Sequence, residues 1–133
     1  MVITLKDGFK SEDKTIVISG DTKALDIMIE KSKNADILVH EVEYTGGLKD
    51  RDPKWYNYHK SVHTLSIDLA KIAKVAKPKL LVTTHRIYHM NILDNSKNIV
   101  EEMNKRDELI LQEIKDAGYL GKVVNGKDLD VFE

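Results

Sequence analysis

The sequence contains no cysteine, which excludes disulfide bonds and thiolate metal sites. Any metal ion must therefore be held by histidine, aspartate or glutamate side chains. No segment approaches ~18 consecutive apolar residues, and none near the N-terminus resembles a signal peptide. We therefore expect a cytoplasmic protein that does not contact a membrane. The net charge of −1 provides no overall excess of positive charge, so nucleic acid is not favoured as a partner.

Several common functional motifs are also missing. The chain has no glycine-rich phosphate loop, no Gly-x-Ser-x-Gly nucleophile turn and no His-Glu-x-x-His metal motif. Its 133 residues are 41% apolar and 32% charged, which is ordinary for one globular domain with its own core. We therefore predict a single domain over residues 1–133.

Three apolar segments each end in an acidic or histidine residue, which is the most informative pattern in the chain. The first leads into Gly20 and Asp21, the second into His40 and Glu41, and the third into His85. In open α/β sheets, ligands bind just beyond the carboxyl ends of parallel strands. If the three strands are parallel neighbours, Asp21, Glu41 and His85 converge on one site. Read alone, each residue also has an ordinary explanation as a helix cap or a hydrogen-bonded polar group.

Helical spacing of apolar residues alternates with these strands, which predicts an α/β fold. Residues 44–63 break the alternation and are predicted to form a long loop that contains an aromatic cluster. The predicted elements are strands 2–5 and 14–19, a helix over 23–33 capped by Thr22, strand 36–41, a helix to Ala76 capped by Thr64, strand 79–84, a helix from Ser96 to about Lys115, and short strands over 121–124 and 129–132.

Two histidine pairs have a spacing of four residues, which on a helix would place both rings on one face, as in many metal sites. The pairs are His59 with His63 and His85 with His89. The first precedes a predicted helix and the second follows a predicted strand. We therefore expect neither pair to be helical, and neither to bind one metal ion as a pair.

Four blocks of sequence carry a resemblance to a known fold. They are residues 16–22, 35–41, 63–64 and 78–85. In this order and with this spacing, they resemble the C-terminal half of the metallo-β-lactamase fold. The most similar branch contains the tRNA 3′-end endonucleases (ribonuclease Z-like) and the arylsulfatase-like hydrolases. The resemblance implies one sheet with its helices, which is one half of an αββα sandwich.

The resemblance also implies roles for particular residues. Asp21 matches an aspartate that bridges two metal ions, and His85 matches the last histidine ligand. His63 matches a histidine that assists catalysis, and Glu41 a glutamate linked to it in proton transfer. The implied activity is hydrolysis of a small ester or a phosphodiester by a metal-bound hydroxide. Zinc or manganese suits such histidine and carboxylate ligands.

The family's N-terminal half supplies a His-x-His-x-Asp-His motif, and this chain contains no His-x-His. We therefore expect the metal site to be incomplete, and the chain to be inactive unless another chain completes it. One face of the sheet should be apolar and buried against a separate N-terminal half or a second copy of the chain.

Two alternatives to a hydrolase half remain open. The first is a non-catalytic remnant or interaction module that keeps the half-fold and dimerises. The second is a flavodoxin-like domain with a carboxylate site at Asp21 and helices on both faces of its sheet.

Overall fold

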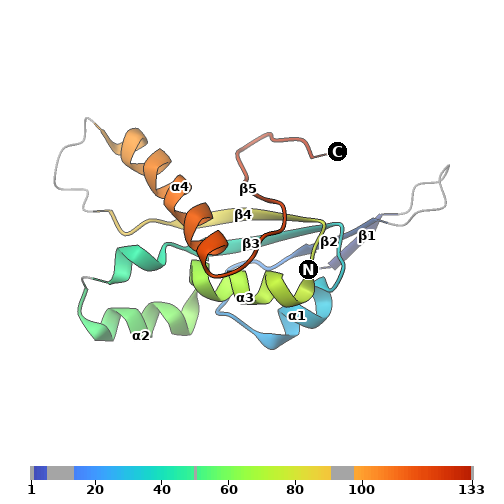
Figure 1. Ribbon diagram of the computed structural model, residues 1–133, viewed down its shortest axis with the longest axis horizontal. Helices are drawn as coiled ribbons and strands as arrows, with labels where there is room; N and C mark the ends of the chain where they lie inside the picture. Colours follow the sequence, from blue (N-terminus) through green and yellow to red (C-terminus); the bar gives the residue numbers. More distant parts are fainter. Residues whose placement is uncertain (1, 6–13, 50, 91–97, 133) are drawn as a thin grey trace.

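The computed structural model describes residues 2–5, 14–49, 51–90 and 98–132, and side chains from residue 14 onward. Five strands form one sheet in the order β1-β2-β3-β4-β5, with helices packed against it (Figure 1). The elements are β1 (Val2–Leu5), β2 (Lys14–Ile18), α1 (Asp26–Ser32), β3 (Ile37–Glu43), the 3₁₀ helix η1 (Thr45–Leu48), α2 (Pro53–Val62), α3 (Ser66–Ala76), β4 (Leu80–Ile87), α4 (Ile99–Asp116) and β5 (Val123–Asn125).

The order of the strands places the connecting helices on one face. Strand β1 pairs antiparallel with β2, whereas β2, β3, β4 and β5 are parallel and lie in sequence order. Because parallel crossovers are right-handed, successive steps in one direction put every crossover on the same side. Helix α3 accordingly packs between α1 and α4. The flavodoxin-like alternative requires helices on both faces, and α1, α3 and α4 do not meet that requirement.

The core lies between the sheet and this helical layer. Val17, Leu38 and Leu81 stand side by side in register on neighbouring strands and are almost completely buried. Burial of each such side chain contributes roughly 1.5–3 kcal/mol to folding. Helices α3 and α4 cover them with further buried residues, which include Leu69, Ala73, Ile110 and Ile114.

The opposite face of the sheet is apolar but only partly covered. Ile16, Ile37 and Leu80 are aligned across it and are half-buried. The segment after β5 runs along the side of the sheet opposite α1 and α3 (Figure 1), and its Phe132 lines a pocket of about 470 Å³ with these three residues. The strands are thus apolar on both sides, as expected, while the helical layer covers one.

The prediction of an uninterrupted loop over residues 44–63 is wrong. The segment contains η1 and the ten-residue helix α2. The Asp52 side chain accepts a hydrogen bond from the Lys54 N–H at 2.9 Å, and Pro53 occupies the first helical position. An aspartate N-cap followed by proline is a well-established start signal for a helix.

Both threonines predicted as helix caps have another role. Helix α1 begins at Asp26 and α3 at Ser66, and neither has a side-chain cap. Instead, the Thr64 hydroxyl donates a hydrogen bond to the Thr22 carbonyl oxygen at 2.7 Å. The two threonines therefore tie the turn after β2 to the start of α3. The predicted cap at Ser96 lies outside the described residues.

The C-terminal segment also differs from the prediction. Residues 129–132 do not form the predicted strand. The Gly126 N–H donates to the Thr83 carbonyl oxygen at 2.9 Å, so the chain continues along β4 beyond β5. Within the described parts of the chain, no helix is long and apolar enough to cross a membrane.

A candidate metal site at the strand ends

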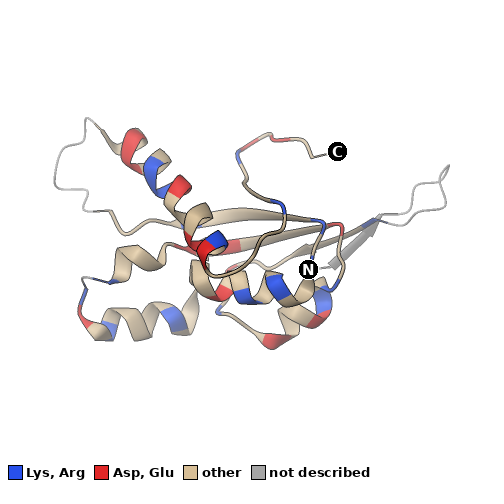
Figure 2. Ribbon diagram, in the orientation of Figure 1, with Lys and Arg blue, Asp and Glu red and all other residues tan. Residues whose placement is uncertain are grey.

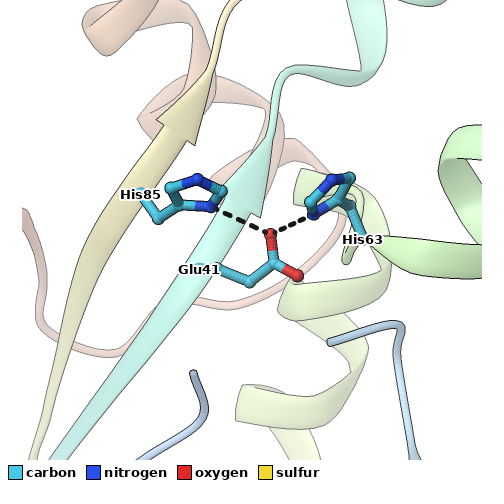
Figure 3. A group of neighbouring side chains, drawn as sticks. All are labelled: Glu41, His63 and His85. Atoms are coloured by element: carbon cyan, nitrogen blue, oxygen red, sulfur yellow. Dashed lines mark hydrogen bonds and ion pairs between the residues drawn. The ribbon is translucent and has the colours of Figure 1, made fainter. Parts of the chain in front are cut away.

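The carboxyl ends of β2, β3 and β4 bring the predicted site residues together. His85 Nδ1 lies 3.2 Å from Asp21 Oδ1 and 3.7 Å from Glu41 Oε2. His63 Nδ1, at the end of α2, lies 2.9 Å from the same Glu41 oxygen. Figure 3 shows both imidazole rings directed at the Glu41 carboxylate. All four residues implied by the family resemblance thus meet at one place.

Glu41 is the buried centre of this group, with no exposed surface. Its Oε1 accepts a hydrogen bond from the Thr22 N–H at 2.6 Å, and its own N–H donates to Ser19 Oγ at 3.1 Å. Both partners belong to the turn that carries Asp21. The positive φ of +65° at Gly20 allows this tight turn, because a residue without Cβ adopts that conformation at little cost. The same turn therefore positions Asp21 and holds the Glu41 side chain in place.

A β-bulge directs His85 toward the site. Glu41 is opposite Thr84 and Val42 is opposite Arg86, so His85 is the extra residue of β4. Its φ of +40° is unusual for a residue with a side chain. Bulges are common next to active sites, where they re-aim a side chain. The apolar pattern predicts a strand that ends at Thr84, and it contains no signal for this bulge.

Burial raises the pKa of the Glu41 carboxyl group above its ordinary value. The Thr22 N–H and His63 oppose this shift, whereas the nearby Asp21 charge adds to it. A buried carboxyl group with a raised pKa that contacts an imidazole is a common arrangement at sites of proton transfer.

The donor set fits a divalent transition metal ion. Glu41, His63 and His85 each offer one ligand atom, and these atoms lie within 4.8 Å of one another. Asp21 adds a carboxylate oxygen from the exposed side of His85. Carboxylate oxygen and imidazole nitrogen are ligands for zinc, manganese and iron. Catalytic zinc sites have three protein ligands and one open position.

The sequence reasoning missed a second cluster beside the first. Glu43, His59 and His89 also bring three possible ligand atoms within 4.8 Å of one another. The expectation that His59 is not helical is wrong, because His59 lies in α2 and His63 follows its last residue. Each histidine pair is divided between the two clusters. The available signal was the alternation Glu41-Val42-Glu43, which directs two carboxylates to the same face of a strand.

Comparisons with known proteins identify the class. No model of a known protein family matches the chain. Among solved structures, the metallo-β-lactamase fold protein YhfI from Bacillus subtilis superposes with a TM-score of 0.59 and 26% identity, over 95% of this chain and 41% of that chain. The sheet with its single helical layer therefore matches part of a metallo-β-lactamase fold, as the sequence predicted.

Among curated proteins, the chain is similar to ribonuclease Z. It is 32% identical to ribonuclease Z of Methanosarcina acetivorans over 106 residues, which are 76% of this chain and 33% of the relative. It is 31% identical to ribonuclease Z of Shouchella clausii over 120 residues, which are 90% of this chain and 32% of the relative. The chain thus spans about a third of these proteins and is related to hydrolases of the metallo-β-lactamase superfamily.

Proposed function

We propose that this chain is the C-terminal half of a metal-dependent hydrolase, and that a polypeptide with the remaining metal ligands completes it. The observation that carries the proposal is the convergence of Asp21, Glu41, His63 and His85 at the ends of three parallel strands. The matched relatives are about three times as long as the region they share with this chain. This length leaves room in them for a complementary half.

In the completed site, Asp21 and His85 would hold the metal from this side. A bound divalent ion such as zinc or manganese would supply Lewis acidity for hydrolysis of an ester or phosphodiester bond. Only two of the four residues would be ligands in this arrangement, which is fewer than a catalytic site requires. The isolated chain should therefore bind metal weakly here and hydrolyse substrates slowly.

Glu41 and His63 would move protons in this scheme. His63 Nδ1 contacts Glu41, so the other ring nitrogen, Nε2, remains available to donate a proton to a leaving group. Glu41 is held by the Thr22 N–H and cannot turn away without losing that hydrogen bond. The carboxylate thereby orients the imidazole ring.

The half-buried sheet face would form the interface with the missing half. Ile16, Ile37 and Leu80 lie on the face opposite the helical layer, where the second sheet of an αββα sandwich packs. Sheets in such sandwiches stack about 10 Å apart through apolar side chains.

The relatives suggest an RNA phosphodiester as the substrate of the completed enzyme, because they are named ribonuclease Z. This chain would contribute little to RNA binding through charge. Acidic and basic residues are interleaved along α4 (Figure 2), and salt bridges such as Arg106 with Glu102 neutralise part of that charge. A small ester remains the alternative substrate.

The proposal can be tested by complementation. The chain, with zinc or manganese, is assayed with bis(p-nitrophenyl) phosphate and p-nitrophenyl acetate, alone and after co-expression with a His-x-His-x-Asp-His half of ribonuclease Z. We expect turnover to be much faster in the complemented sample than with the chain alone. This gain should be lost in Asp21→Asn and His63→Ala but not in the exposed control Lys23→Ala. A stable complex in which Asp21→Asn turns over as fast as the wild type would contradict the proposal.

The second candidate is a non-catalytic module that dimerises through the same apolar face. The partial exposure of Ile16, Ile37 and Leu80 favours some partner, and a second copy is the simplest. Sedimentation equilibrium distinguishes the two. A tight homodimer that the complementary half does not dissociate supports this module, whereas a monomer that forms a heterodimer supports the hydrolase half.

A further inference from the structure

The second cluster combines two imidazoles and one carboxylate in a largely buried position. Glu43 Oε1 lies 2.8 Å from His59 Nδ1 and also contacts His89 Nε2. The Glu43 side chain is fully buried, and the His59 and His89 side chains are 17% and 6% exposed. The rings of His59 and His89 meet edge to face, with centroids 4.6 Å apart. Each residue comes from a different element: β3, α2 and the segment after β4.

Hydrogen bonding within the described residues leaves this cluster incompletely satisfied. Glu43 Oε2 and His59 Nδ1 are buried atoms without a hydrogen-bond partner there. The contact between His59 and Glu43 is close, but it lacks the alignment of a hydrogen bond. Buried polar groups normally have partners, because an unsatisfied one costs about 1–3 kcal/mol. A metal ion that takes one ligand atom from each side chain would replace the hydrogen bond between Glu43 and His89 and would give His59 a partner.

The chain brings His89 close to the cluster through a local arrangement of the backbone. His89 has a φ of +54°, which a residue with a side chain seldom adopts. A Cβ atom added to Gly47 would lie 2.9 Å from the His89 Cβ atom and 3.1 Å from the Tyr88 carbonyl oxygen. Glycine at this position in η1 therefore permits the His89 side chain to reach Glu43.

We propose that Glu43, His59 and His89 form a metal-binding site of their own, distinct from the site at Asp21 and His85, for a first-row divalent ion such as Zn²⁺. Two histidines and one glutamate are a known zinc ligand set with an open fourth position. In a tetrahedral zinc site, adjacent ligand atoms are about 3.3 Å apart. The three side chains need only small shifts to reach that spacing.

This site differs from the first in one testable respect, because its three ligands all belong to this chain and are buried together. It does not depend on a complementary half or on hydrolytic activity. The isolated chain should therefore retain about one equivalent of Zn²⁺ here, even where the first site binds weakly. Because folded-state binding stabilises a protein, the retained ion should also raise the Tm.

The experiment is a Zn²⁺ titration of the full chain against a chromophoric chelator, with Co²⁺ absorption as a second readout. The variant His63→Ala/His85→Ala removes both imidazoles of the first cluster. We expect it to keep one equivalent of Zn²⁺ and the visible Co²⁺ bands of a low-symmetry site. We expect His59→Gln and His89→Gln to bind Zn²⁺ at least ~10-fold more weakly, since even outer partners of a metal ligand contribute that much.

Circular dichroism establishes that each variant is folded. If the His59 and His89 variants do not fold, the His63→Ala/His85→Ala variant decides alone, because it keeps only the second cluster. Absence of stoichiometric Zn²⁺ from that folded variant would overturn the proposal. So would unchanged Zn²⁺ affinity in folded His59→Gln and His89→Gln, because the cluster would then be a buried group of ion pairs.

Discussion

Replacing Glu113 with alanine should destabilise the fold, because this carboxylate joins α4 to the segment that follows the site strand β3. It accepts hydrogen bonds from the Thr45 N–H at 3.1 Å, from the Gly46 N–H at 2.8 Å and from the Ser66 hydroxyl. Thr45 and Ser66 are buried, so the alanine variant would leave their polar groups without this acceptor.

The magnitude follows from these three contacts. A hydrogen bond to a charged group contributes roughly 1.5–3 kcal/mol. Glu113 itself is partly exposed, so water can replace part of the lost bonding in the variant. We therefore expect a loss of about 3 kcal/mol in the free energy of unfolding for Glu113→Ala. Glu113→Gln keeps one acceptor oxygen and should lose less than half of that.

The measurement is urea unfolding followed by circular dichroism. With a slope near ~2 kcal/mol per molar, the midpoint for Glu113→Ala should fall by about 1.5 M. Glu108→Ala, an exposed glutamate on the same helix, is the control and should change stability by less than ~0.5 kcal/mol. Equal midpoints for the two variants would refute the argument that Glu113 holds these elements together.

Two further predictions concern His40 and Gly47. Burial lowers the pKa of His40 below its ordinary 6.5, so the unfolded chain binds the proton more readily. Stability should be complete above pH 6.5 and decline as the pH falls below it, and urea unfolding of His40→Gln should show a smaller decline. Gly47→Ala should cost about 1–3 kcal/mol through contact with His89 and weaken Zn²⁺ binding at the second cluster. Gly20→Ala, which meets no atom within 4 Å, should cost only about 1 kcal/mol and leave that binding unchanged.

The sequence predicted the sheet well because its strands are nearly continuous apolar runs of β-branched and leucine residues. Such runs identify parallel strands buried on both faces. The same reasoning failed where the hydrogen bonds of individual side chains, and not the periodicity of apolar residues, determine the local structure. Threonine is a common N-cap residue, yet Thr64 donates its hydrogen bond to Thr22 and so joins two loops. The Asp52-Pro53 pair starts a helix whose residues are mostly exposed and therefore lack a clear apolar period.

The site was predictable to the extent that strand ends are predictable. Asp21, Glu41 and His85 could be grouped because parallel strands place their carboxyl ends at one edge. The bulge that turns His85 inward could not, because it depends on the register between β3 and β4. His63 follows a helix and not a strand, so the strand pattern could not place it at the site. Only the family resemblance indicated it.

The two clusters share one geometric origin. Glu41 and Glu43 are two residues apart on β3, which is roughly 6.6 Å along a strand. His59 and His63 are four residues apart at the end of α2, which is about 6 Å along a helix. The spacing of the two glutamates along β3 thus nearly equals the spacing of the two histidines along α2. A helix end that places His63 against Glu41 therefore also places His59 against Glu43. His85 and His89 complete the two sets from β4 and the segment after it. A metal ion in the second cluster would therefore hold α2 against β3 and fix the position from which His63 contacts Glu41.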